Sequence, residues 1–314
     1  MFPQLVAGPI VRYVDIKKSI TSRVTCFADF EYGVRRFSVG LIKKVLVADY
    51  LGQCADKIFH LVEFQQVSMV TAWVGAIAYT YEIYYDFSGY SDMAIGIGRC
   101  LGFKFEENFN YPYVAKSVSD FWKRWHISLT KWFKDYVYIP LGGNRVSKAR
   151  HILNLLIVWL LTGFWHGANW TFLLWGGMYF VVLLFEKKTT IINKLPSCLG
   201  KVYTMVIVVI GWVLFKSPNI HVATTFLKDM VGINGIVDSN SALVAKSVCV
   251  IGIIAILFSY PVVTIVKTKM EQASKQSLKR VFEVIIDILI VLLYIYSLFV
   301  ILNGSYSPFI YFNF

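Results

Sequence analysis

The sequence is organised around residues 120–170, which read DFWKRWHISL at 120–129, YIPLGGNR at 138–145 and GFWHGANW at 163–170. Seven of the nine tryptophans of the chain lie between Trp122 and Trp175. Two histidines, His126 and His166, each follow a tryptophan and stand 40 positions apart. His166 lies in a long apolar run, where an ionisable side chain is costly to place. A functional role is therefore the first interpretation for it.

The apolar run around His166 predicts a helical hairpin in a membrane. Residues 151–185, 35 in number, contain no Asp, Glu, Lys or Arg. Two complete membrane-spanning helices need about 40 residues, so the run is long enough for an excursion across the bilayer and back. Its apex would be Gly167-Ala168-Asn169, which puts His166 in a confined place.

The composition of the whole chain agrees with a membrane protein. Of its 314 residues, 57% are hydrophobic and 16% are charged, and the mean hydropathy is +0.58. Soluble domains carry about 25% charged residues, so this chain has too little polar material to cover a globule. Further spans are expected at 67–85, 202–215, 242–266 and 281–302. We therefore expect an all-α, polytopic integral membrane protein in contact with lipid.

The net charge of +12 does not point to nucleic acid, because the basic residues cluster in short segments between apolar runs. By the positive-inside rule, the loops at 143–150, 186–201 and 267–280 face the cytoplasm, and 217–240 and 303–314 face outside. This pattern predicts a multi-pass protein of the cell membrane. The five cysteines are scattered and indicate free, packed thiols.

Two amphipathic segments are expected at the membrane surface. Residues 31–60 predict an interfacial helix pair, and residues 119–136 predict one amphipathic helix with His126 at the edge of its apolar stripe. Residues 1–30 and 217–240 are expected to be loops.

Three carboxylates lie beside the span at 67–85. Glu82 falls within it, and Asp86 and Asp92 lie in a Gly- and Ser-containing stretch that predicts a helix break near Ser91. The three groups could form an acid/base site. Acidic residues at helix breaks more often cap helices, so capping and pairing with Arg99 and Lys104 is the favoured interpretation.

These segments together resemble the membrane-bound O-acyltransferase family. The matching motifs are FPQLVAGPI (2–10), DFSGYSDMA (86–94), FWKRWHISL (121–129), WFKDYVYIPLGGNR (132–145) and TGFWHG (162–167). The IPLGG element (139–143) is closer to the alginate O-acetyltransferase branch than to the teichoic acid D-alanyltransferase branch. The motifs cover about residues 1–180, whereas the C-terminal spans within 202–302 match only in being hydrophobic.

The resemblance implies a single membrane domain over 1–314, with interfacial and re-entrant helices around a tunnel. An acyl thioester, acetyl-coenzyme A in the first place, would enter from the cytoplasmic side. The acyl group would pass to hydroxyls of an exported cell-surface polysaccharide, directly or through an extracellular acceptor protein. Family members carry several membrane helices before the segment matching 2–10, so the chain is expected to lack N-terminal helices and its own activity is left open.

The resemblance also assigns roles to the two histidines. The essential histidine of the family maps onto His166 and its second histidine onto His126. Transfer to a hydroxyl needs a base, and the ordinary pKa of histidine, about 6.5, suits that role. No Gly-x-Ser-x-Gly elbow is present, so we expect direct transfer. Catalytic roles are predicted for His166 and His126, and substrate-binding roles for Lys123, Arg124, Trp125, Trp165, Asn169 and Asp135.

Other interpretations stay open. His166 could be a packing histidine of the hairpin, and His126 an interfacial residue. The chain could transfer D-alanine to teichoic acid, or be a non-catalytic membrane scaffold. The tryptophans could be belt anchors, tunnel walls or both. Zinc takes three or four ligands, and no cysteine or carboxylate lies beside either histidine, so neither a metal nor a bound cofactor is expected.

Overall fold

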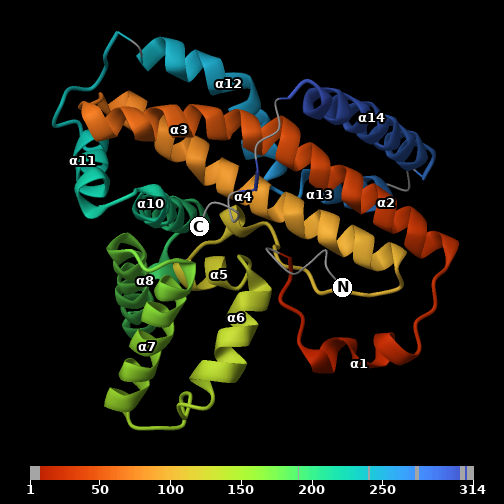
Figure 1. Cartoon of the computed structure of the whole chain (residues 1–314), viewed down its shortest axis with the longest axis horizontal. Coiled ribbons are helices and arrows are strands. Elements are labelled where there is room, and N and C mark those ends of the chain that lie inside the picture. The colour runs from red at the N-terminus through yellow and green to blue at the C-terminus, as the bar shows by residue number, and fades with distance from the viewer. Residues whose placement is uncertain (1–7, 190, 240, 273–275, 305–307, 310–314) are drawn as a thin grey trace. The chain divides into compact units, whose positions relative to one another are not determined.

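The computed structural model describes residues 8–189, 191–239, 241–272, 276–304 and 308–309 (Figure 1). The motif at 2–10 therefore lies largely outside the described residues. Within those ranges the regular elements are helices, as expected. They are α1 (Tyr13–Thr21), α2 (Phe27–Ile42), η2 (Lys43–Ala48), α3 (Asp49–Phe64), α4 (Met69–Cys100), η3 (Pro112–Val114), α5 (Val118–Trp122), α6 (Ile127–Phe133), η4 (Lys134–Tyr138), α7 (Lys148–His166), α8 (Trp170–Lys188), α9 (Ile191–Lys194), α10 (Ser197–Lys216), α11 (Ile220–Met230), α12 (Ser241–Phe258), α13 (Val262–Gln272) and α14 (Gln276–Leu302).

Four of these helices, α8, α10, α12 and α14, are long and apolar enough to cross a membrane. Their outward faces carry many exposed aliphatic side chains, which fits a lipid solvent better than water. Together with the helical content, this confirms the expectation of a polytopic membrane protein.

The helices form two compact units. The first contains the described parts of Met1–Tyr50, Glu82–Tyr111 and Ile253–Asn313, and the second contains Leu51–Tyr81 and the described parts of Pro112–Gly252. Both histidines of interest belong to the second unit. In the first unit, α2 packs closely against the second half of α4.

The helix break expected near Ser91 is absent, because α4 continues for 32 residues. The glycines serve packing instead of a turn: a Cβ on Gly89 would lie 2.8 Å from the carbonyl oxygen of Gly40 in α2. The Ser91 hydroxyl accepts a hydrogen bond from Asn108 over 3.2 Å, so it does not cap a helix. Tertiary packing overrides the local signal here.

Five other expectations need correction. The predicted helix at 119–136 is divided into α5, α6 and the π-helical turn η4. Residues 1–30 contain α1, and the expected loop at 217–240 contains α11, whose first turn is capped by Asn219. The span expected at 242–266 ends at Phe258, and Pro261 precedes a separate helix, α13. The segment at 31–60 is helical as expected, but α2, η2 and α3 follow one another without a break and do not form a separated pair.

The helical hairpin predicted at 151–185 is confirmed as α7 and α8, although only α8 is among the four helices long and apolar enough to cross a membrane. Asn169 caps α8 by accepting a hydrogen bond from the Thr171 backbone N–H over 3.2 Å. The helices approach so closely that a Cβ on Gly176 would collide with the carbonyl oxygen of Trp159. Small residues allow this approach between membrane helices.

We expect Gly176→Ala to lower stability by about 1–3 kcal/mol, because the added methyl group must push the two backbones apart. Gly177→Ala is the matched control, since a Cβ there meets nothing within 4 Å. The measurement is the thermal unfolding midpoint of both variants in detergent. Equal midpoints would show that the α7–α8 contact is looser than described.

Candidate active site

His166 is the last residue of α7 and lies at the apex of the hairpin. Its side chain is buried, with 9% of its surface exposed. Three aromatic rings lie against the imidazole: Trp165 at 4.9 Å, Phe215 at 5.0 Å and Trp175 at 5.3 Å between ring centroids. The histidine therefore sits in an apolar pocket of rings, where a neutral imidazole is favoured over an imidazolium.

His126 lies between α5 and α6 and is also buried, at 3% exposed. Its backbone adopts the left-handed conformation (φ +44°, ψ +54°), which interrupts the predicted helix at this residue. Such a conformation is uncommon for a residue with a side chain and occurs often at functional sites. Burial lowers the pKa of His126 well below its ordinary value, and the nearby His166 lowers it further.

One indole joins the two histidines. The ring of Trp165 lies 6.1 Å from His126 and 4.9 Å from His166, centroid to centroid. The structure thus brings together His126, His166 and Trp165, three of the residues singled out in the sequence. Two neutral imidazoles facing a common indole can accept or relay a proton.

Lys123 is exposed and helps to line a hollow of about 430 Å³ at the open end of the hairpin. His151 of α7 and Lys187 of α8 line the same hollow, together with Tyr138. Arg124 is held differently, because its guanidinium pairs with Asp120 at 2.9 Å. Of the two predicted substrate-binding cations, Lys123 therefore lines the hollow, whereas Arg124 is paired with Asp120.

The remaining predicted residues have separate positions. Trp125 is buried and packs on Phe121 (5.6 Å) and Trp212 (4.8 Å between ring centroids). Asn169 caps α8, donates a hydrogen bond to the Pro218 carbonyl over 2.7 Å, and lines a second hollow of about 630 Å³ at the apex of the hairpin. Asp135 lies half-buried in η4.

Sequence reasoning missed Glu186, which ties α5 to α8. Its carboxylate accepts hydrogen bonds from the backbone N–H groups of Val118 (2.7 Å) and Ser119 (2.8 Å) and from the Ser119 hydroxyl (2.6 Å). This contact fixes the segment that leads to His126. The signal in the sequence that could have identified it is a single acidic residue at the end of an apolar helix.

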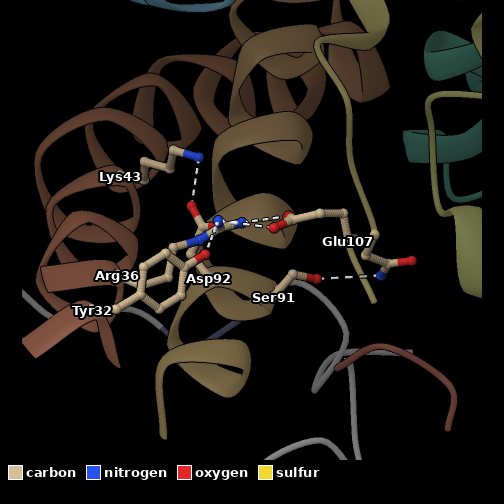
Figure 2. Close-up of polar contacts among 7 residues, drawn as sticks. Tyr32, Arg36, Lys43, Ser91, Asp92 and Glu107 are labelled. Atoms are coloured by element: carbon tan, nitrogen blue, oxygen red, sulfur yellow. Dashed lines mark hydrogen bonds and ion pairs between the residues drawn. The ribbon is translucent and has the colours of Figure 1, made fainter. Parts of the chain in front are cut away.

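Asp86 and Asp92 form ion pairs inside the first unit, so the expected pairing is right in kind, but both lie within the unbroken α4 and the expected capping is wrong. Asp92 of α4 faces Arg36 of α2 at 2.6 Å and Lys43 at 2.6 Å, and Arg36 also reaches Glu107 (Figure 2). Asp86 pairs with Lys44 at 2.6 Å. The partners differ from those expected, since Arg99 pairs with Asp29.

In the described part of the chain, no group of three His, Cys, Asp or Glu side chains is arranged to hold a metal ion.

The sequence profile of the membrane-bound O-acyltransferase family matches residues 1–219. A probable alginate O-acetylase AlgI of Pseudomonas syringae is 47% identical over 226 residues, covering 71% of this chain and 43% of that protein. A peptidoglycan O-acetyltransferase of Helicobacter pylori is 40% identical, covering 75% of this chain and 46% of that protein. A teichoic acid D-alanyltransferase of Bacillus subtilis is 29% identical, covering 70% of this chain and 60% of that protein.

The chain thus spans less than half the length of the first two relatives. The matched region contains both histidines, the α7–α8 hairpin and the four motifs at 86–167 that carry the resemblance. With a profile match over more than half of its residues and relatives at 40% and 47% identity, the chain belongs to the membrane-bound O-acyltransferase family.

Proposed function

We propose that the chain is an O-acyltransferase that moves an acyl group, most simply acetyl, from a cytoplasmic thioester to hydroxyls of an exported cell-surface polysaccharide. Transfer is direct or passes through a partner protein. The observation that carries the proposal is the pair of buried imidazoles on Trp165, at the apex of a membrane hairpin. Burying two ionisable side chains at such a position costs free energy, which indicates a functional role for the pair.

His166 acts as the general base in this proposal. Its neutral imidazole accepts the hydroxyl proton of the acceptor while the hydroxyl oxygen attacks the thioester carbonyl carbon. When the carbon–sulfur bond breaks, the imidazolium returns that proton to the leaving thiolate. His126, held in its left-handed turn against the same indole, positions the donor beside His166.

The hollow at the open end of the hairpin suits the donor. It lies beside the basic loops at 143–150 and 186–201, which the charge pattern places on the cytoplasmic side. Lys123, Lys187 and His151 line it, and cationic groups attract the phosphates of a carrier such as coenzyme A. The charge of Glu186, which also lines it, is directed to the N–H groups of α5.

We expect Lys123→Ala to raise the KM for acetyl-coenzyme A several-fold while kcat changes little, because the lysine attracts the donor and not the transition state. The difference should shrink at high ionic strength, where exposed charges are screened. Lys134→Ala is the control, since Lys134 is exposed on the adjacent helix turn and does not line the hollow. An unchanged KM for Lys123→Ala would place the donor elsewhere.

Acetyl is favoured over D-alanyl because the relatives named O-acetylase and O-acetyltransferase match at 47% and 40%, against 29% for the D-alanyltransferase. The test is the content of base-labile acetyl groups on the cell-surface polysaccharide after deletion of the gene. Loss of acetyl, restored by the wild-type gene, is expected. Loss of D-alanine esters would favour the second activity, and unchanged esters would favour a scaffold.

A further inference from the structure

Four buried hydrogen-bond donors near the hairpin have no partner among the residues that the structure describes. They are the indole N–H groups of Trp122, Trp175 and Trp212 and the hydroxyl of Tyr179. All four side chains are at least nine-tenths buried. A buried donor without a partner is costly, and folded proteins contain few of them. Aromatic faces nearby are only weak acceptors.

The four donors form one cluster around Trp175. The centroid of the Trp175 ring lies 5.1 Å from that of Tyr179, 5.5 Å from Trp122 and 6.4 Å from Trp212. Trp175 and Tyr179 are four residues apart in α8 and therefore lie on one face of that helix. Trp122 comes from α5 and Trp212 from α10. Three helices thus converge on a dry site rich in donors.

Trp175 is the member of this cluster that touches the proposed base. Its ring lies 5.3 Å from that of His166 at an interplanar angle of 82°. Its side chain is 1% exposed, so neither water nor lipid reaches it in the structure. The Trp175 N–H has no acceptor among the described residues. A molecule that binds beside His166 can supply that acceptor atom.

We propose that Trp175 is a catalytic residue whose indole N–H donates a hydrogen bond to the carbonyl oxygen of the acyl group during transfer. The proposal rests on the proposed function, because it takes His166 as the base. It adds the group that stabilises the oxyanion, which the histidines alone do not provide.

The acceptor oxygen bonds to the carbonyl carbon as its proton passes to His166, and the carbonyl π electrons move onto oxygen. That oxyanion accepts the hydrogen bond from Trp175. The carbonyl then re-forms, the carbon–sulfur bond breaks, and the thiolate takes the proton back from His166. A fixed donor in a water-free site stabilises the developing charge more than the ground-state carbonyl.

The test replaces Trp175 by phenylalanine and, separately, by 3-benzothienylalanine, which keeps the ring size but has sulfur in place of the N–H. Both are made in the gene at its own locus, and acetyl transfer from acetyl-coenzyme A is measured in membranes. We expect kcat to fall about 10²–10³-fold in both, as for loss of one oxyanion donor. The KM for acetyl-coenzyme A should stay within about twofold, because ground-state binding is retained.

Trp73→Phe is the matched control, since the Trp73 indole N–H already donates to the Met230 carbonyl over 3.0 Å. It should keep wild-type kcat. If Trp175→Phe fails to fold, the benzothienyl variant decides the question. Full turnover of that variant overturns the proposal and leaves Trp175 a packing role.

The same membranes separate this inference from the proposed function. If the His166→Ala protein is inactive while the Trp175 variants are active, the oxyanion role of Trp175 is contradicted and the base role of His166 is not. An active His166→Ala protein contradicts the base on which both depend.

Discussion

Replacement of His166 by alanine is expected to abolish acyl transfer while the donor still binds. Loss of a general base costs about 10²–10⁴ in rate. The buried ring sits among Trp165, Trp175 and Phe215, so alanine also leaves a cavity, but one remote from the donor hollow. We expect kcat to fall to background with a nearly unchanged binding constant for acetyl-coenzyme A.

His126→Ala should give a different result. His126 is proposed to position the donor, so its loss should raise the KM and lower kcat by a smaller factor. His60→Ala is the control, because His60 is a surface residue of α3 that lies 3.8 Å from Glu63 and packs edge-on against the Phe64 ring. Near-normal turnover of His166→Ala would show that the base is assigned to the wrong residue.

Replacement of Lys44 by methionine is expected to destabilise the first unit by about 3–5 kcal/mol, the usual cost of breaking a buried ion pair from one side. The Lys44 ammonium is 2% exposed and lies 2.7 Å from Asp49 and 2.6 Å from Asp86. It also donates to the Pro308 carbonyl over 3.0 Å. Burial alone would lower the pKa of Lys44, but the charge of Asp86 and the hydrogen bonds of both carboxylates raise it above its ordinary value.

Lys43→Met is the matched control for this prediction. Lys43 is the neighbouring residue in η2, is one-quarter exposed, and shares Asp92 with Arg36. Removal of Lys43 leaves Asp92 paired with Arg36, so we expect a loss of stability of less than about 1 kcal/mol. Thermal unfolding in detergent compares the two variants. If the Lys44→Met and Lys43→Met variants lose the same stability, burial of Lys44 does not determine how much its ion pair contributes to stability.

The hairpin could be predicted from the sequence because its signals are local. An uncharged run of suitable length and the capping residue Asn169 are enough to place α7, its apex and α8. His166 could be singled out for the same reason, since a histidine inside an apolar run stands out whatever surrounds it.

The contacts that make the site could not be predicted in this way. His126 meets Trp165 only because the chain turns left-handed at residue 126, and no local signal marks that turn. The sequence does not distinguish Trp175 from tryptophans that line a tunnel or anchor a membrane belt, because its burial and the lack of an acceptor for its N–H among the described residues depend on the tertiary fold. The unbroken α4 likewise depends on Gly40 and Gly89 meeting across two helices.

The central claim is that an acyl group passes from a cytoplasmic thioester to an exported hydroxyl through His166. Inside-out membrane vesicles loaded with the cell's own polysaccharide test it most directly, with radiolabelled acetyl-coenzyme A supplied on the cytoplasmic face. We expect labelled, base-labile acetyl on the enclosed polysaccharide with the wild-type protein and background labelling with His166→Ala. Equal labelling by the two proteins, or labelling only when the thioester is inside the vesicles, would contradict it.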